Sequence, residues 1–98
     1  MPKYVEEKVA GYWLYYTATC INEGIVHVHA NKPTTGRKNS AKLWVYEDGH
    51  SSVAEIGQLK KAELLQIQDW IADNIDIIRQ EWFDKNPDRK IEWKIKEV

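Results

Sequence analysis

One stretch of the chain, residues 59–84, restricts the possible folds more than any other. Its large apolar residues recur at spacings of three and four positions, and they are Leu64, Ile67, Ile71, Ile75, Ile78 and Trp82. This spacing is typical of an α-helix that lies along a core. Asn86, Pro87 and Asp88 then end the pattern. We predict one long amphipathic helix, roughly 38 Å in length at about 1.5 Å per residue, with one end overhanging a small sheet.

Two segments before this helix have the character of β-strands. Residues 10–17 are aromatic or apolar at most positions, which predicts a strand buried on both faces, in a central or dimer-covered position. Residues 25–30 alternate instead, with Val26, Val28 and Ala30 on one face and Ile25, His27 and His29 on the other. If the valine face lies on the core, both histidines point away from it.

A β-hairpin is predicted around an Asp-Gly pair. Residues 42–46 and 51–56 flank this pair, and Asp-Gly between two strands favours a two-residue type I′ turn. The hairpin centred on it makes three favourable cross-strand pairs. They are Lys42 with Glu55, Trp44 with Val53, and Glu47 with His50.

A last strand is predicted after the helix, because Ile91, Trp93 and Ile95 alternate with charged residues. The chain has 98 residues, enough for one core, and it shows neither an internal repeat nor a second domain. We therefore expect a single α+β domain over residues 1–98. Its four- to five-stranded, mostly antiparallel sheet is packed by one long amphipathic helix.

The cysteine content and the distribution of apolar runs bear on location. Cys20 is the only cysteine, which excludes an internal disulfide and fits a reducing compartment. The first residues lack the apolar run of a signal peptide, and no later run approaches the roughly 20 apolar residues of a membrane span. We expect a cytoplasmic protein with no membrane partner.

Charge is unevenly distributed, although the net charge is only -1. No Asp or Glu occurs in residues 24–46, and the predicted loop and strand there carry the basic residues Lys32, Arg37, Lys38 and Lys42. Such a basic segment predicts a surface for an anionic partner. With Trp44 and Tyr46 close by, the 31–42 loop also suits a nucleic acid, whose phosphates would meet the basic groups while its bases stack on the rings.

The His-x-His strand is a candidate metal site. Two histidines at positions i and i+2 project from one face of a strand, so His27 and His29 can reach one divalent ion such as zinc or nickel. A third ligand would have to come from His50, Glu47 or Glu55 across the sheet. The alternative is that both histidines are hydrogen-bonded strand residues on a partly exposed face, and no cofactor is then expected.

Catalysis is not favoured by the sequence. No phosphate-binding glycine loop, paired-carboxylate arrangement or Ser-His-Asp spacing is present. Cys20 lacks a catalytic pattern around it and is expected to be a small core residue.

The solvent side of the helix offers a second candidate surface. Asp69, Asp73 and Asp76 form an acidic row opposite the apolar stripe. Trp70 and Ile77 lie between this row and the stripe, where an unidentified protein partner or a second copy of the chain would cover them. This arrangement favours a protein-interaction module.

Several of these residues also resemble a known family. His27-Val28-His29, the run Ala41-Lys42-Leu43-Trp44 and a helix ending in Glu81-Trp82 resemble domain-of-unknown-function family 4160 from about residue 24 to residue 84. The resemblance implies a bacterial origin and a role beside a partner protein, as in toxin–antitoxin-like pairs. Many members have prolines before the first histidine, where this chain has Ile25-Val26.

The sequence therefore predicts a small intracellular binding module with an unidentified partner. A nucleic-acid-associated module that uses the 31–42 loop, and a metal-binding protein or enzyme that uses His27 and His29, are the alternatives.

Overall fold

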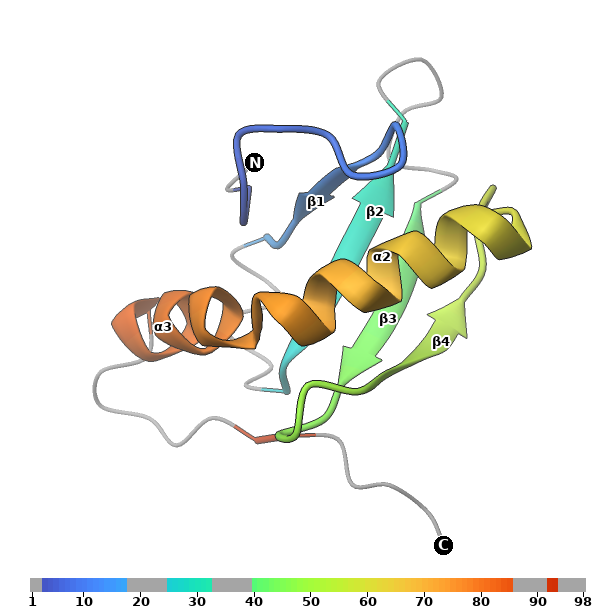
Figure 1. Cartoon of the computed structure of the whole chain (residues 1–98). Coiled ribbons are helices and arrows are strands. Elements are labelled where there is room, and N and C mark those ends of the chain that lie inside the picture. The colour runs from blue at the N-terminus through green and yellow to red at the C-terminus, as the bar shows by residue number, and fades with distance from the viewer. Residues whose placement is uncertain (1–2, 18–24, 33–39, 86–91, 94–98) are drawn as a thin grey trace, which may run out of the picture.

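A computed structural model describes residues 3–17, 25–32, 40–85 and 92–93 (Figure 1). Within these residues the chain forms four strands followed by two helices. The elements are β1 (Trp13–Tyr15), β2 (His27–Asn31), β3 (Ala41–Val45), β4 (Ser51–Glu55), α2 (Lys61–Asp73) and α3 (Ile75–Lys85).

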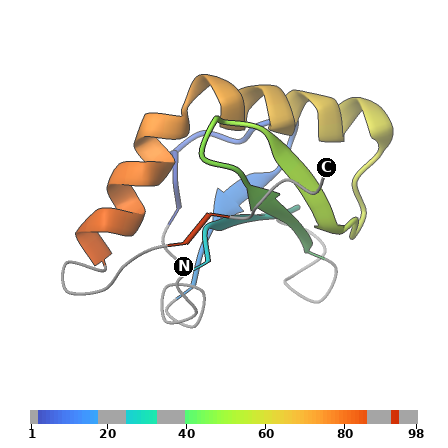
Figure 2. The same cartoon turned by 90° about the horizontal axis from the view of Figure 1, so that it is seen from below.

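The strands form one sheet in the order β1-β2-β3-β4, and all neighbours are antiparallel. α2 lies over one face of this sheet, and α3 continues from it past the edge of the sheet (Figures 1 and 2). α2 crosses the strands, whereas α3 projects past the sheet (Figure 1). The predicted α+β architecture is confirmed.

The core lies between the sheet and the helices. Val26, Val28 and Ala30 are completely buried, so the face of β2 that was expected to meet the core does so. The predicted helix stripe supplies the other layer, where Ile67, Ile71, Ile78 and Trp82 are buried. Leu64 and Ile75 pack against the same cluster at its margin. The alternation of period two and the stripe of period 3.6 therefore both identified the core residues.

One long helix was expected, but the helix is interrupted at Asn74. The side-chain amide of Asn74 donates to the carbonyl oxygen of Trp70 at 2.9 Å, and its backbone N–H lies 3.0 Å from the same oxygen. Asparagine side chains compete for backbone hydrogen bonds in this way, which makes Asn a poor residue inside helices. The apolar stripe continues across the break, so periodicity alone gave no sign of it.

The hairpin between β3 and β4 is present, but its turn differs from the prediction. The backbone N–H of Tyr46 donates to His50 O at 2.8 Å, and that of Gly49 donates to Tyr46 O at 3.0 Å. Three residues therefore form the loop, with Gly49 at a φ of 96°. This is the three-residue hairpin loop that ends in a left-handed glycine.

The longer loop changes the pairs that follow it. Val53 pairs with Leu43 rather than with Trp44, and the side chain of His50 contacts Asp48 at 2.8 Å rather than Glu47. An irregularity between Lys42 and Leu43 then restores the expected pair of Lys42 with Glu55. Two of the three predicted pairs were wrong, because the register of a hairpin follows its loop length.

β1 is an edge strand, which corrects the central position predicted from its apolar character. The N-terminal segment covers its outer side, where the backbone N–H of Tyr4 donates to Leu14 O at 3.0 Å and Lys3 forms a bridge with Tyr15. The ring of Tyr4 is itself buried against Tyr16, with ring centroids 5.1 Å apart. The N-terminal segment therefore covers the outer edge of this strand, and the alternative of cover by a second copy of the chain stays a prediction.

Some predictions fall on residues outside those that the structure describes. These include Cys20, Arg37, Lys38 and most of the C-terminal strand. Of that strand, Glu92 forms a parallel bridge with Ile25, and its carbonyl oxygen accepts a hydrogen bond from Val26 at 2.9 Å. Within the described ranges, neither helix has the length and apolar character of a membrane span.

Candidate binding surface

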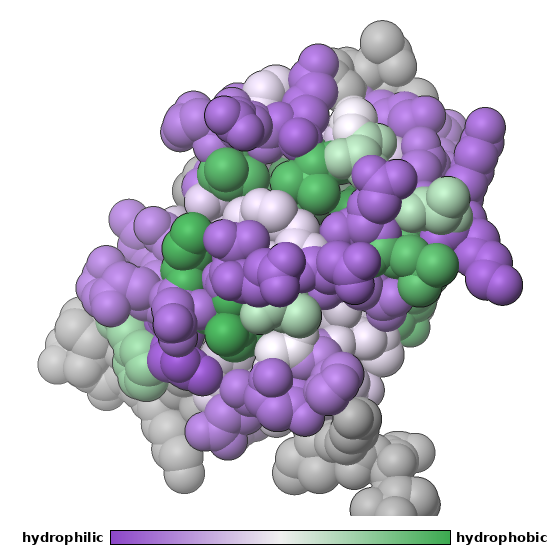
Figure 3. Space-filling view, in the orientation of Figure 1, coloured by the Kyte–Doolittle hydropathy of each residue, from purple (hydrophilic) through white to green (hydrophobic). Residues whose placement is uncertain are grey.

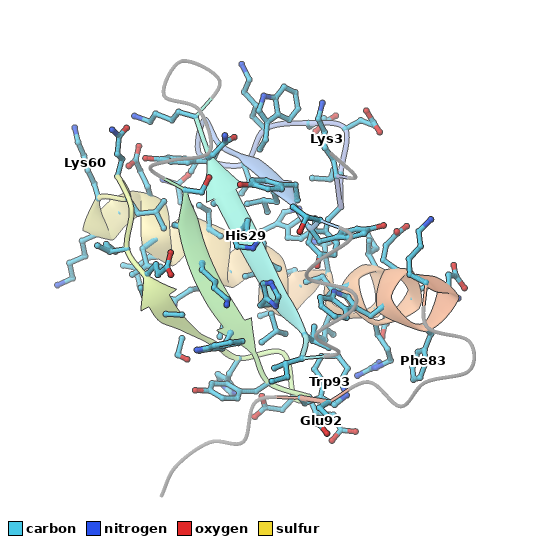
Figure 4. The ribbon with its side chains drawn as sticks, turned by 180° about the vertical axis from the view of Figure 1, so that it is seen from behind. Lys3, His29, Lys60, Phe83, Glu92 and Trp93 are labelled. Carbon is cyan, nitrogen blue, oxygen red and sulfur yellow. The ribbon has the colours of Figure 1, made fainter. Side chains whose placement is uncertain are left out.

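The sheet has a second face, on the side away from the helices (Figure 4). Cross-strand partners share a face, so the register defines which side chains belong to it. Trp13 is opposite Asn31, Tyr15 is opposite His29, His29 is opposite Lys42, and His27 is opposite Trp44. On β4, Glu55 is opposite Lys42 and Ser52 is opposite Trp44. We call this set the outer face, and it consists of Trp13, Tyr15, His27, His29, Asn31, Lys42, Trp44, Ser52 and Glu55.

A chain of aromatic rings crosses the outer face from β1 to β3. The rings of Tyr15 and His29 are stacked with centroids 5.3 Å apart. His29 meets His27 edge to face at 4.9 Å, and His27 meets Trp44 in the same way at 5.7 Å. Ring contacts of this kind stabilise beyond the area that they bury. They hold the side chains of three strands in fixed positions.

Lysine ammonium groups sit on the two tryptophans at opposite corners of this face. Lys42 Nζ lies 4.3 Å from the centroid of the Trp44 ring. Lys3 Nζ lies 3.9 Å from the Trp13 ring and Lys8 Nζ lies 5.4 Å from it. These are cation–π distances, at which the ring quadrupole attracts the charge. A lysine ammonium group is thus held over each tryptophan ring, and the ring helps to fix its position.

Carboxylates gather on the other side of the molecule. The acidic row predicted on the helices is exposed, and it consists of Asp69, Asp73 and Asp76. Figure 3, which views the helix side, shows hydrophilic side chains over much of α2 and α3. On β4, Glu55 is the exception, because it is paired in register with Lys42. The exposed acidic row therefore lies on the helices, whereas Lys3, Lys8 and Lys42 lie at the outer face, where Glu55 is the neighbour of Lys42.

The predicted metal pair is brought together, but not on an open surface. His27 is only 1 % exposed, so the expectation that both histidines lie on a partly exposed face is wrong for His27. Its Nδ1 lies 2.7 Å from Ile25 O, and since a carbonyl only accepts, this nitrogen carries the proton. Within the described residues no group of three His, Cys, Asp or Glu side chains is placed to share a metal ion.

His27 is buried because the end of α3 and the N-terminal segment close over β2 there. The rings of His27 and Trp82 are 5.6 Å apart. Trp82 Nε1 donates to the Tyr4 hydroxyl at 2.7 Å, and that hydroxyl donates to His27 O at 2.8 Å. The sequence alone gave no indication of this network, because Tyr4 stands outside every periodic segment.

The basic residues of the predicted loop do not share one surface. Lys32 Nζ lies 3.8 Å from Glu63 Oε2 and 5.2 Å from the centroid of the Tyr12 ring, beside the start of α2. Lys42 lies on the outer face. Arg37 and Lys38 are outside the described residues. The lysines that join Lys42 on this face, Lys3 and Lys8, come from the N-terminal segment, which lies outside the acid-free stretch.

The second predicted surface lies on the helices. Trp70 is half-buried and packs against the core at its margin, and Ile77 is 43 % exposed. Their role in binding a partner stays a prediction. Trp13, Tyr15, Lys3 and Lys8 were missed as candidates, although the shared parity of Trp13 and Tyr15 places them on one face of a strand.

Two tyrosines bind helix carboxylates on the core side of the sheet. The Tyr12 hydroxyl lies 2.9 Å from Glu63 Oε1, and burial together with this carboxylate raises the pKa of Tyr12 to about 12. Burial and Glu81, whose Oε2 is 2.6 Å from the Tyr16 hydroxyl, also raise the pKa of Tyr16. The backbone N–H of Lys60, which donates to Glu63 at 2.9 Å, lowers the pKa of the Glu63 carboxyl.

Comparison with known protein families places most of the chain in one family. A family model described as "Domain of unknown function (DUF4160)" matches residues 11–83. This span includes all four strands, α2 and all but the last two residues of α3. Neither a curated protein nor a solved structure matches the chain.

Proposed function

The chain belongs to the DUF4160 family of domains of unknown function, and from that premise we propose that it is a binding module that holds an anionic partner on the outer face of its sheet. A single observation carries this proposal. Ammonium groups are seated on Trp13 and Trp44 at two corners of a rigid ring surface, while the acidic row lies on the helices.

The positions of the charged groups favour an anionic partner at the outer face. Within the described residues none of the three recorded ion pairs involves Lys3, Lys8 or Lys42. An anion is attracted to these ammonium groups, although Glu55 is paired in register with Lys42, and the acidic row on the helices disfavours its approach there. The rings beneath them add apolar area that a partner buries on contact.

The construction of the outer face also suits binding. It carries aromatic rings in contact with one another and ammonium groups over two of them. The rings come from three paired strands, so their positions are set by the sheet.

Binding can be tested with poly-L-glutamate as the anionic probe. We expect the indole N–H signals of Trp13 and Trp44 to shift in two-dimensional NMR spectra at low salt, and to shift less as salt shortens the Debye length to about 8 Å. Lys42→Ser should reduce the shift at Trp44. Lys61→Ser is the matched control, because Lys61 is an exposed lysine at the start of α2. Equal shifts in both variants, or none in the unaltered protein, would contradict the proposal.

A further inference from the structure

We infer that two copies of this chain pair through β4, edge to edge and antiparallel, so that their sheets join into one. This inference goes beyond the proposed function, because it concerns an edge of the sheet and not its outer face. The two edges differ. The N-terminal segment covers the edge at β1, where the backbone N–H of Tyr4 donates to Leu14 O. Among the residues that the structure describes, no segment pairs with the free side of β4.

Main-chain groups of β4 point away from the sheet. The backbone N–H of Tyr46 donates to His50 O, and hydrogen-bonded pairs alternate with non-bonded pairs along an antiparallel ladder. Ser51 and Val53 belong to non-bonded pairs, so their N–H and C=O groups face the free edge. In agreement with this direction, Gln68 Nε2 on α2 donates to Ser51 O at 3.0 Å. A carbonyl oxygen can accept a second hydrogen bond. Outward groups of this kind are a template for another strand.

The regular part of β4 determines the register of the pairing. The register shift in this strand leaves Ala54 without a partner in β3, so the regular ladder covers only Ser51–Val53. Its centre is Ser52, which we place on a two-fold axis. Ser51 N–H then donates to Val53 O of the second copy, and Val53 N–H donates to Ser51 O of the second copy. Because the axis relates the copies, each of these bonds is made twice.

The side chains of β4 are compatible with this pairing. Protected edge strands often carry lysine or proline, and the sequence of β4, Ser-Ser-Val-Ala-Glu, has neither. Its charged residue, Glu55, is three positions from the axis, so the two copies of Glu55 are roughly 20 Å apart at about 3.3 Å per residue. This distance exceeds the Debye length of about 8 Å at physiological ionic strength, so their repulsion is small.

Exposed apolar side chains lie beside the free edge. Val53 is 37 % exposed, and Leu65 of α2 is 52 % exposed. Leu65 precedes Gln68 by three positions, so it shares the side of α2 that bonds to β4. Figure 3 shows hydrophobic atoms exposed on this side of the molecule, to the right. A two-fold axis perpendicular to the sheet keeps both α2 helices on one face, where these apolar side chains become covered.

The covered edge at β1 limits the assembly to two copies. Pairing through β4 uses the free edge of each copy, and the outer edges of the joined sheet are then the two β1 strands with their N-terminal segments. The contact is isologous, so it closes as a dimer and does not extend into a fibre. The same outward groups serve both sides of the contact, which is why a second copy matches this edge.

Sedimentation velocity from micromolar to millimolar concentration measures the self-association. We expect the mass to rise from monomer to dimer, and the Ser51 and Val53 amides to exchange with deuterium more slowly as the dimer forms. Val53→Pro removes an outward N–H that makes no bond to β3, so the strand is retained. It should weaken dimerisation about tenfold or more, because the bond is lost in both copies. Leu65→Lys should also weaken dimerisation, through the added charge at the contact.

Ile77→Lys is the matched control, because Ile77 is similarly exposed but lies on α3, and it should leave dimerisation unchanged. Circular dichroism verifies that each variant is folded, and Leu65→Lys decides the result if Val53→Pro does not fold. A protein that stays monomeric at millimolar concentration overturns the inference. A dimer that neither edge variant weakens, or whose formation leaves the exchange of the Ser51 and Val53 amides unchanged, also overturns it. None of these results depends on anion binding at the outer face.

Discussion

Val28 and His27 are neighbours in β2 that point to opposite faces of the sheet, and both are almost fully buried. Val28 lies in the apolar layer beneath the helices, where burial of hydrocarbon stabilises the fold. On the other side His27 meets the rings of His29 and Trp44, and it also contacts the ring of the core residue Trp82 from α3. The core face is closed by helices, whereas the outer face is closed only in part and keeps lysines at its corners. One side of this sheet forms the core, and the other is the side on which we propose that a partner binds.

The largest effect is expected from a charge placed on the core side. Ile71 is completely buried, so Ile71→Asp buries a carboxylate without a partner and should cost several kcal/mol of a total that is typically about 5–15 kcal/mol. Thermal unfolding followed by circular dichroism measures the loss. Ile77→Asp is the control, since Ile77 is 43 % exposed on the neighbouring helix and its replacement should change stability by less than about 1 kcal/mol. A folded Ile71→Asp protein with an unchanged midpoint would contradict the core assignment.

The two histidines of the outer face should differ in their effect on stability. His27→Ala removes a buried ring from contact with Trp44 and Trp82 and should cost about 2–4 kcal/mol, as for other large-to-small changes in cores. His29 is only half-buried, so His29→Ala should cost about 1 kcal/mol or less. Urea denaturation midpoints compare the two variants. A greater loss of stability in His29→Ala than in His27→Ala would show that the burial of a side chain on this face does not determine its contribution to stability.

Alkaline pH should lower the stability of the folded protein through Tyr12 on the core side of the sheet. The pKa of Tyr12 is raised from 10.0 to about 12, so the folded protein holds this proton more tightly than the unfolded chain. The stabilisation is present below pH 10 and is lost as the pH rises from 10 towards 12. We expect the thermal midpoint to fall over this window, and to fall less steeply in Tyr12→Phe. Tyr46→Phe is the control, because the Tyr46 hydroxyl donates to Ser52 on the hairpin. If the thermal midpoint falls equally steeply with pH in all three proteins, Tyr12 is not the cause of the alkaline loss of stability.

The smallest effect is expected at the lysines of the outer face. The ammonium group of half-buried Lys42 contributes to stability through the Trp44 ring, and such contacts are worth about 0.5–1 kcal/mol at exposed sites. Lys42→Ser should therefore shift the urea midpoint only slightly, while it weakens binding of the anionic probe at Trp44. If Lys42→Ser lowers the unfolding free energy as much as His27→Ala does, the main role of this lysine is to stabilise the fold and not to bind a partner.

Sequence patterns predicted the core well because the core depends on periodicity. The alternation of Val26 and Val28 and the stripe from Ile67 to Trp82 each placed buried residues correctly, since burial of one face is what those patterns encode. The interruption at Asn74 and the three-residue loop before His50 depend on individual hydrogen bonds, and the apolar pattern is the same with or without them.

The candidate site was predicted only in part. Lys42, His27 and His29 were identified from local composition. The partnership of Trp13 with Lys3 and Lys8 was not, because it joins an edge strand to an irregular N-terminal segment. The burial of His27 depends on a helix that lies far along the chain, so a rule based on alternation places this residue on the correct face but at the wrong depth.

The bond between Trp82 and Tyr4 joins residues 78 positions apart. A ribosome must release the end of α3 before this contact can form, so the rings around His27 stay open to water for most of synthesis. Nascent strands with exposed apolar faces are prone to aggregate, and chaperones recognise such faces. Deletion of the first few residues, Tyr4 included, removes the contact that closes over these rings. Although only a few residues are lost, we expect a clear fall in the yield of newly made protein.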